Sequence, residues 1–414
     1  MIKRLILIVS ILFTVITSAQ EGTSSPYSFY GIGLTTFEGT VENRSMGGLS
    51  IFSDSIHINL QNPAGYGELA LTTYTLGGTH SMISTKSDTD KEYSNVTSLD
   101  YIAIGIPTGK FGFGFGLMPY TSVGYNLINV NEEEGTAARF EGSGGLNKVF
   151  LGAGFKINKN FSLGAGVDYN FGTIQNKNLH LREGVQYGTR EINQSKLSGF
   201  SFNFGVNYQQ MLSEGLQIRA GATYIPESKL SSENMRELAL VAFSNSGGEL
   251  IGDRRDIPVE NTEYTLPAKF TFGSGIGQPR KWFLGLEYSN REAANFNNRS
   301  FALKGATYTS ASTYIIGGFY IPDYSSLTSY FSRIVYRGGF RMEETGLSLQ
   351  GEPIKEFGIS FGVGLPVKGF SNINLGIEYG QRGTTSSDLI QEDFLNLSIS
   401  LSLNDKWFLQ RKFK

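Results

Sequence analysis

Along most of the chain, apolar and polar residues alternate one by one. Residues 396–403 read Asn-Leu-Ser-Ile-Ser-Leu-Ser-Leu without a break. Alternation with a period of two gives a strand one apolar and one polar face. The pattern predicts about fourteen strands, at 69–81, 97–107, 110–122, 146–157, 160–175, 196–211, 215–226, 263–275, 281–291, 301–320, 331–344, 354–367, 372–383 and 394–403.

Such strands fit either a soluble sandwich, whose apolar faces meet in a core, or an outer-membrane barrel, whose apolar faces meet lipid. Tight turns such as 107–110 and 158–160 alternate with longer loops. A solenoid would show a fixed repeat length, and none is found. Short periplasmic turns and long extracellular loops are typical of barrels. We therefore predict an all-β fold, a transmembrane antiparallel β-barrel of about fourteen strands, with longer loops near 119–145, 176–195, 228–262 and 384–393.

One connection departs from this alternation. Residues 321–331 form a longer loop that falls on the expected periplasmic side.

The N-terminus has the pattern of an export signal. Lys3 and Arg4 precede an apolar run, Leu5 to Ile16, and small residues stand before a cut ahead of Gln20. We expect a signal peptide at 1–19, an irregular N-terminal hatch at 20–68 and the barrel at 69–414, with both termini periplasmic. The expected location is the outer membrane of a Gram-negative cell.

Composition supports this class. The 414 residues include 52 glycines, 30 phenylalanines and 21 tyrosines, which suit small lumen positions and aromatic girdles. The absence of cysteine excludes disulfides, thiolate metal sites and a lipid-anchored cysteine. A formal charge of -2 gives no sign of a nucleic-acid partner.

The alternation also assigns faces to the strands. Leu397, Ile399 and Leu401 should face lipid, while Ser398 and Ser400 face the lumen. A cation on the lipid face costs about 2–4 kcal/mol at the midplane, so charged strand residues should point inward. These charges either pair with each other and a plug or line a path for a polar or amphipathic solute. They are Asp168, Arg219, Lys269, Glu287, Arg333, Arg337 and Glu378.

Three short motifs precede the first strand: Arg-Ser-Met-Gly-Gly-Leu-Ser at 44–50, Ser-Asp-Ser at 53–55, and Asn62-Pro63-Ala64-Gly65. Pro63 has a fixed φ and disfavours a helical Asn62, whose side chain can cap a turn. The segment resembles the N-terminal hatch of the FadL/TodX long-chain fatty acid transporter family. The resemblance implies that Asn62, Pro63, Ala64 and Gly65 belong to a gate in the lumen. The alternative is a simple turn into the first strand.

The chain departs from that family in two respects. The acidic patch is reduced to Asp54, and the inward strand positions offer little apolar surface. An apolar pocket would have to come from the hatch itself, at Ile51, Phe52, Ile56, Ile58 and Leu60.

The resemblance leaves two functions open. The first is passive, hatch-gated uptake of hydrophobic small molecules such as long-chain fatty acids. The second follows from the Ala-Gln signal junction and the basic C-terminal tail, which look like FadL-type barrels of the Bacteroidota. Some of these serve as a subunit or carrier in an outer-membrane complex, for type IX secretion or outer-membrane protein assembly, without transport activity. Expected partners are outer-membrane lipid and either a hydrophobic small molecule or other outer-membrane proteins.

Residues 231–243 place Met235, Leu238 and Val241 at helical spacing behind a serine-rich start. The resemblance implies an outer-loop helix that collects ligand. The helix could also pack over the barrel mouth or dock another protein.

No catalytic or cofactor chemistry is expected. His57, His80 and His180 have no metal-ligand spacing. Residues 142–148 lack the Gly-x-x-x-x-Gly-Lys spacing of a phosphate loop and are interpreted as an ordinary loop. We expect neither an enzyme nor a bound metal or cofactor.

Overall fold

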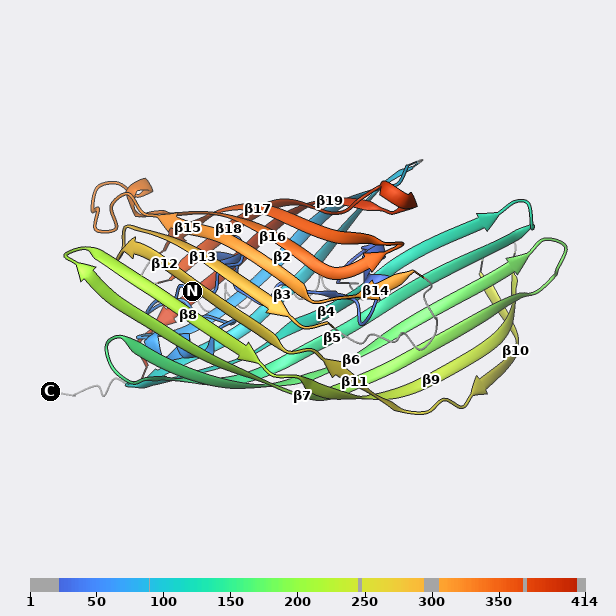
Figure 1. Ribbon diagram of the computed structural model, residues 1–414, viewed down its shortest axis with the longest axis horizontal. Coiled ribbons are helices and arrows are strands. Elements are labelled where there is room, and N and C mark those ends of the chain that lie inside the picture. The colour runs from blue at the N-terminus through green and yellow to red at the C-terminus, as the bar shows by residue number, and fades with distance from the viewer. Residues whose placement is uncertain (1–21, 89, 245–247, 294–304, 368–370, 408–414) are drawn as a thin grey trace, which may run out of the picture.

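The computed structural model describes residues 22–88, 90–244, 248–293, 305–367 and 371–407. Within these residues, fourteen antiparallel strands form a closed ring in which β19 pairs with β2 along its whole length. Figure 1 shows the ring with the N-terminal segment, drawn in blue, inside it. The predicted fourteen-stranded barrel is confirmed.

The ring strands are consecutive neighbours, except where outer hairpins intervene. They are β2 (Thr72–Lys86), β3 (Lys91–Thr108), β4 (Phe111–Asn131), β5 (Thr136–Lys156), β6 (Phe161–Arg182), β7 (Gly188–Ser213), β8 (Leu216–Ile225), β12 (Lys269–Gln278), β13 (Trp282–Arg291), β15 (Ala311–Tyr320), β16 (Val335–Leu349), β17 (Glu352–Pro366), β18 (Asn372–Gly383) and β19 (Gln391–Asp405).

The other elements are short or lie outside the ring. They are η1 (Pro26–Phe29), β1 (Leu34–Thr35), α2 (Val41–Arg44), η2 (Pro63–Glu68), β9 (Ser228–Phe243), β10 (Glu249–Ile257), β11 (Thr262–Leu266), β14 (Ala306–Tyr308), η3 (Phe331–Arg333) and η4 (Ser386–Asp388). Among the described residues, no helix is long and apolar enough to cross a membrane.

The alternation places the side chains as the sequence predicts. On β19, Leu397, Ile399 and Leu401 are exposed on the outer surface, whereas Ser398 and Ser400 are buried inside. This arrangement puts apolar side chains against lipid and polar ones in the lumen.

The two ends of the barrel differ. At the turn end, neighbouring strands are joined by short connections such as 109–110 and 279–281. At the hairpin end, strands predicted to stop early continue in pairs, as β4 and β5 do until Asn131 faces Thr136. The expected loops at 119–145 and 176–195 are therefore mostly strands, and residues 142–148 lie within β5 rather than in a loop. By the usual asymmetry of such barrels, the turn end is periplasmic and the hairpin end extracellular.

The wall is not fully paired. Strands β3 and β4 pair only between Ile102–Thr108 and Phe111–Leu117. Beyond that point β3 pairs with β2 alone, and β4 pairs with β5. We call this unpaired stretch the seam, bounded by residues 91–101 and 118–131. Figure 1 shows the β2–β3 hairpin and the β4–β5 hairpin diverging there.

The N-terminal segment, residues 22–71, runs from the hairpin end toward the turn end. Ser24 contacts Ser94 near the outer end of β3, and the hydroxyl of Tyr27 donates to the carbonyl of Ile390. The first described residues thus lie at the hairpin end, whereas the expected signal peptide and the N-terminus itself, expected to be periplasmic, lie outside the described residues. The described C-terminal strand does end at the turn end.

Candidate functional site

The Asn62–Gly65 motif forms the start of η2 and binds the barrel wall. The side chain of Asn62 accepts a hydrogen bond from the amide of Ala64 at 3.0 Å, which caps the short helix. The same side chain donates to Asn207 of β7 at 2.8 Å. Asn62 therefore orders the turn and attaches it to the wall.

Glycines on the inner wall let the Asn62–Gly65 motif and the 44–50 motif approach the strands closely. A Cβ added at Gly164 of β6 would overlap the amide of Ala64, and one at Gly205 of β7 would overlap the Asn62 side chain. On the opposite wall, a Cβ at Gly317 or Gly339 would overlap the backbone at Met46. The backbone of the N-terminal segment thus lies directly against the backbone of the barrel.

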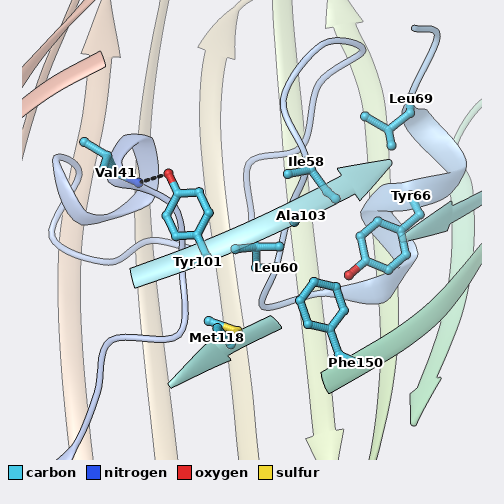
Figure 2. Packing of buried hydrophobic residues seen from close by; sticks show 9 residues of the cluster. All are labelled: Val41, Ile58, Leu60, Tyr66, Leu69, Tyr101, Ala103, Met118 and Phe150. Atoms are coloured by element: carbon cyan, nitrogen blue, oxygen red, sulfur yellow. Dashed lines mark hydrogen bonds between the residues drawn. The ribbon is translucent and has the colours of Figure 1, made fainter. Parts of the chain in front are cut away.

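A buried apolar cluster holds the segment against β3, β4 and β5. Figure 2 shows Ile58, Leu60 and Tyr66 of the segment packed beside wall residues. The amide of Val41 donates to the Tyr101 hydroxyl at 3.1 Å. The cluster comprises Val41, Ile58, Leu60, Tyr66, Leu69, Tyr101, Ala103, Met118 and Phe150.

A second cluster packs Ile51 and Phe52 against β13 and β15. Most of the hatch residues that could have lined an apolar pocket are instead buried by packing against the wall. They are Ile51, Ile58 and Leu60.

Charged wall residues contact the N-terminal segment. Lys148 lies 3.4 Å from Glu38 and 3.6 Å from Asp168. Arg219 lies 3.6 Å from Glu68, and the amide and hydroxyl of Ser50 both donate to Glu287 at 2.8 Å. These contacts tie the segment to three strands, β5, β8 and β13, by ion pairs and charge-assisted hydrogen bonds.

Three of the four remaining predicted lumen charges lie inside the barrel, each in a different environment. Arg337 donates to Asn374 at 3.1 Å, and Asn374 in turn donates to Glu42 of the segment at 2.7 Å. Glu378 lies 3.3 Å from Arg341, and Lys269 lines a cavity. Arg333 is not a strand residue as predicted. It ends η3 in the connection before β16, where its guanidinium stacks on Tyr330.

Sequence reasoning missed several charged partners. Lys148 lies in the predicted strand 146–157 but is missing from the predicted lumen charges, although the alternation through Leu146 and Phe150 gives it an inward position. A network on β16–β19 was also missed, in which Glu356 lies 2.5 Å from both Arg341 and Arg382, and Arg382 lies 3.2 Å from Glu392.

Asp54 and His57 form an ion pair in the segment, 2.7 Å apart. Burial by itself would raise the pKa of Asp54, but the charge and hydrogen bond of His57 outweigh it and lower the pKa to about 2. Burial would lower the pKa of His57, and the Asp54 carboxylate raises it above the usual value. His57 also lies 3.3 Å from Asn372, at the periplasmic start of β18.

Two cavities lie between the segment and the hairpin end. One of about 340 Å³ has acidic, basic, tyrosine and aliphatic lining, including Glu38, Lys269 and Tyr120. The other, about 530 Å³, lies at the seam between Leu99 of β3 and Pro119 of β4. The segment partly fills the seam, because β1 pairs with β4 through Leu34–Ser122 and Thr35–Thr121.

These features describe a lumen filled by its own N-terminal segment. No group of three or more potential metal ligands occurs within the described part of the chain. A family model described as BamG matches residues 1–414.

The chain belongs to the BamG family. No curated protein matches the sequence. Among solved structures, the P. putida toluene transporter TodX is similar, with a TM-score of 0.61 and 17% identity, covering 90% of this chain and 100% of that one. The CymD monoaromatic hydrocarbon channel has a TM-score of 0.56 and 12% identity, covering 89% and 98%. A Pseudomonas aeruginosa FadL homologue has a TM-score of 0.56 and 13% identity, covering 90% and 98%. At these identities the likeness shows the fold, and it confirms the resemblance to FadL/TodX barrels at that level.

The predicted outer-loop helix of this BamG-family barrel is wrong. Met235, Leu238 and Val241 lie on strand β9. The outer half of β7 needs a partner once β8 has ended, and β9 supplies it from Gly188–Val241 to Ser198–Ser231. β9 carries apolar residues on both faces, such as Leu240 and Val241. Its sequence therefore lacks the alternation of apolar and polar residues that predicts a strand.

β9 and β10 continue β4–β7 into an outer sheet that extends past the rest of the rim, at the right of Figure 1. Arg190 lies 2.7 Å from Glu237 and 3.1 Å from Glu249, and Lys177 lies 2.5 Å from Glu249. Leu179, Ala239 and Val241 form a small core beside these pairs. The outer sheet is therefore a packed structure in its own right.

Proposed function

We propose that this BamG-family barrel is a plugged outer-membrane subunit that binds other proteins at the cell surface, within a Bacteroidota outer-membrane complex such as those for type IX secretion or outer-membrane protein assembly. The observation that carries the proposal is the outer sheet, which exposes apolar side chains at the tips of three packed hairpins. They are Ile128, Val130, Val185, Tyr187, Leu250 and Ile251. Exposed apolar groups on an ordered surface away from lipid are typical of protein interfaces.

The filled lumen supports the proposed binding role over free passage of solutes through the barrel. Close backbone contact, two apolar clusters and charge-assisted bonds all hold the N-terminal segment in place. Displacing it would break the Arg219–Glu68 ion pair and the two hydrogen bonds from Ser50 to Glu287, together with the apolar packing.

Purification in a gentle detergent tests the proposal. We expect stoichiometric partner proteins with the parent barrel, and their loss when Ile128, Val130, Leu250 and Ile251 are replaced by serine. Leu212→Ser is the matched control, because Leu212 is equally exposed but lies at the turn end. If the partner proteins persist in the fourfold variant while its heat-modifiable migration shows normal folding, the outer sheet is not the binding surface.

Hatch-gated uptake of a hydrophobic small molecule is the second candidate, favoured by the cavity at the seam. Two of the similar structures are described as a monoaromatic hydrocarbon channel and a toluene transporter, and here β1 partly fills the seam through only two residue pairs with β4. Lipid extracted from the purified barrel, together with uptake that depends on the seam, would favour this candidate. Partner proteins without bound lipid would favour the first.

A further inference from the structure

The connection from β15 to β16, residues 321–334, stands out at the turn end. The other connections there are much shorter, as at 109–110 and 279–281. Figure 1 shows this orange segment, with the short helix η3, projecting past the end of β15. The segment takes no part in filling the lumen, and the proposed function assigns it no role.

Hydrogen bonds order this 321–334 loop. The amide of Asp323 donates to the carbonyl of Ser332 at 2.8 Å, which closes the base. The Tyr330 hydroxyl donates to the carbonyl of Pro366 at 3.2 Å, which fixes the loop to β17. The amide of Ile321 donates to the carbonyl of Lys281 at 2.6 Å, on the neighbouring turn. The loop therefore presents its side chains in defined positions.

These side chains are apolar and exposed. Leu327 is 99% exposed and Phe331 73%, and Tyr324 and Tyr330 are also exposed. Moving such an apolar side chain out of water into an apolar environment is favourable by about 1.5–3 kcal/mol of free energy. An ordered loop that leaves this free energy unused, beyond the strand ends, has the character of a binding surface.

The charge around the apolar residues is positive. Arg280 stacks on Tyr324 at 5.3 Å and Arg333 on Tyr330 at 5.5 Å, with Lys281 beside them. Within the described residues, no carboxylate lies in ion-pair range of these three cations. The nearby Asp323 carboxylate accepts hydrogen bonds from Ser325.

We propose that the 321–334 loop is a docking surface for a periplasmic protein whose contact face has an apolar pocket rimmed by carboxylates. Leu327 and Phe331 would enter the pocket, and Arg280, Lys281 and Arg333 would meet the carboxylates. Tyrosine, arginine and phenylalanine are enriched at such interfaces, and arginine and tyrosine often dominate their binding energy. The inference goes beyond the proposed function, because this surface lies at the opposite end from the outer sheet and can bind independently of it.

In-cell photo-crosslinking of the full-length barrel tests the proposal. A photoreactive residue at Leu327 should give one discrete adduct with a second protein. The same residue at Leu212, exposed at the same end, is the control and should give none. Charge reversal, Arg280→Glu with Lys281→Glu, should reduce the adduct about ten-fold, as should high salt.

The captured protein must then bind directly. Purified alone, it should bind the parent barrel in phospholipid nanodiscs, and bind Leu327→Ser/Phe331→Ser at least about ten-fold more weakly. A lipid adduct, a dimer of this chain, equal adducts at Leu327 and Leu212, or binding unaffected by these substitutions would each overturn the proposal. Normal heat-modifiable migration shows that a variant has folded. Serine variants of the outer sheet should leave this adduct intact, which separates the two proposals.

Discussion

Contact between the N-terminal segment and the wall depends on glycines of the wall strands, which have no side chain. Asn62, Pro63 and Ala64 can lie against β6 and β7 because Gly164 and Gly205 have no Cβ in the way. The motif and the wall glycines are thus two halves of one interface. The sequence showed the motif, but which glycines faced it depended on strand register.

Gly164→Val should loosen this interface. The added side chain would overlap the backbone of Ala64 and Pro63, and overpacking of this kind costs about 1–3 kcal/mol. We expect a higher ion leak through single barrels in planar bilayers. Gly166→Val is the matched control, two residues along the same inner face, where a Cβ would have no neighbour closer than 3.6 Å. Equal leak from the two variants would show that close contact at Gly164 does not hold the segment.

The Asp54–His57 pair should make the segment sensitive to pH. The pKa of His57 is raised, so its contribution is complete below about pH 6.5 and is lost as the pH rises through the higher folded-state value. Asp54 contributes above its unfolded pKa, and that contribution is lost as the pH falls through about 2.

His57→Gln should therefore lower the barrel's melting temperature at pH 6 more than at pH 9. The difference corresponds to no more than about 1 kcal/mol, because both side chains are partly exposed. A constant difference across this range would exclude the pair as the titrating contact.

At the scale of elements, the alternation predicted which segments are strands but not how far they extend. Leu397 to Leu401 face lipid as predicted, because period two survives wherever one face is apolar. It fails in β9, where Leu240 and Val241 make both faces apolar and only the free edge of β7 decides the structure. The sequence does carry one sign of the seam, which the alternation alone does not reveal: Pro119 has no amide hydrogen to donate and stands two residues beyond Leu117, the last β4 residue paired with β3.

Arginine at Ile399 should impair assembly of β19. Ile399 lies midway along the exposed apolar row of the strand, where a cation costs about 2–4 kcal/mol. Leu403→Arg is the control on the same face. Leu403 pairs with Tyr74, near the Tyr74–Trp407 aromatic contact at the turn end, and the cost near an interface falls to about 0–1 kcal/mol. Equal yields of heat-modifiable barrel from both variants would contradict the assigned membrane position. The neighbouring lumen-facing Ser398 is a poor control, because the Arg44 guanidinium lies 3.5 Å away and would repel a second arginine.

At the scale of the whole molecule, the two proposed binding surfaces stand at opposite ends of a filled barrel. The outer sheet lies at the hairpin end and the 321–334 loop at the turn end. The N-terminal segment connects the two ends, since it contacts Ser94 near the outer rim and Asn372 at the start of β18. This arrangement places the two proposed binding surfaces on opposite sides of the membrane without requiring an open channel.

This arrangement requires a defined orientation, which single cysteines can report. The chain has no cysteine of its own, so Leu250→Cys and Leu327→Cys each give one reactive thiol without background. Both side chains are exposed, at 57% and 99%. On intact cells, a membrane-impermeant maleimide should label Leu250→Cys, whereas Leu327→Cys should react only after the outer membrane is permeabilised. The physical reason is the asymmetry of connections, with long hairpins outside and short turns inside. Labelling of Leu327→Cys on intact cells, with Leu250→Cys protected, would invert the barrel and assign each surface to the opposite compartment.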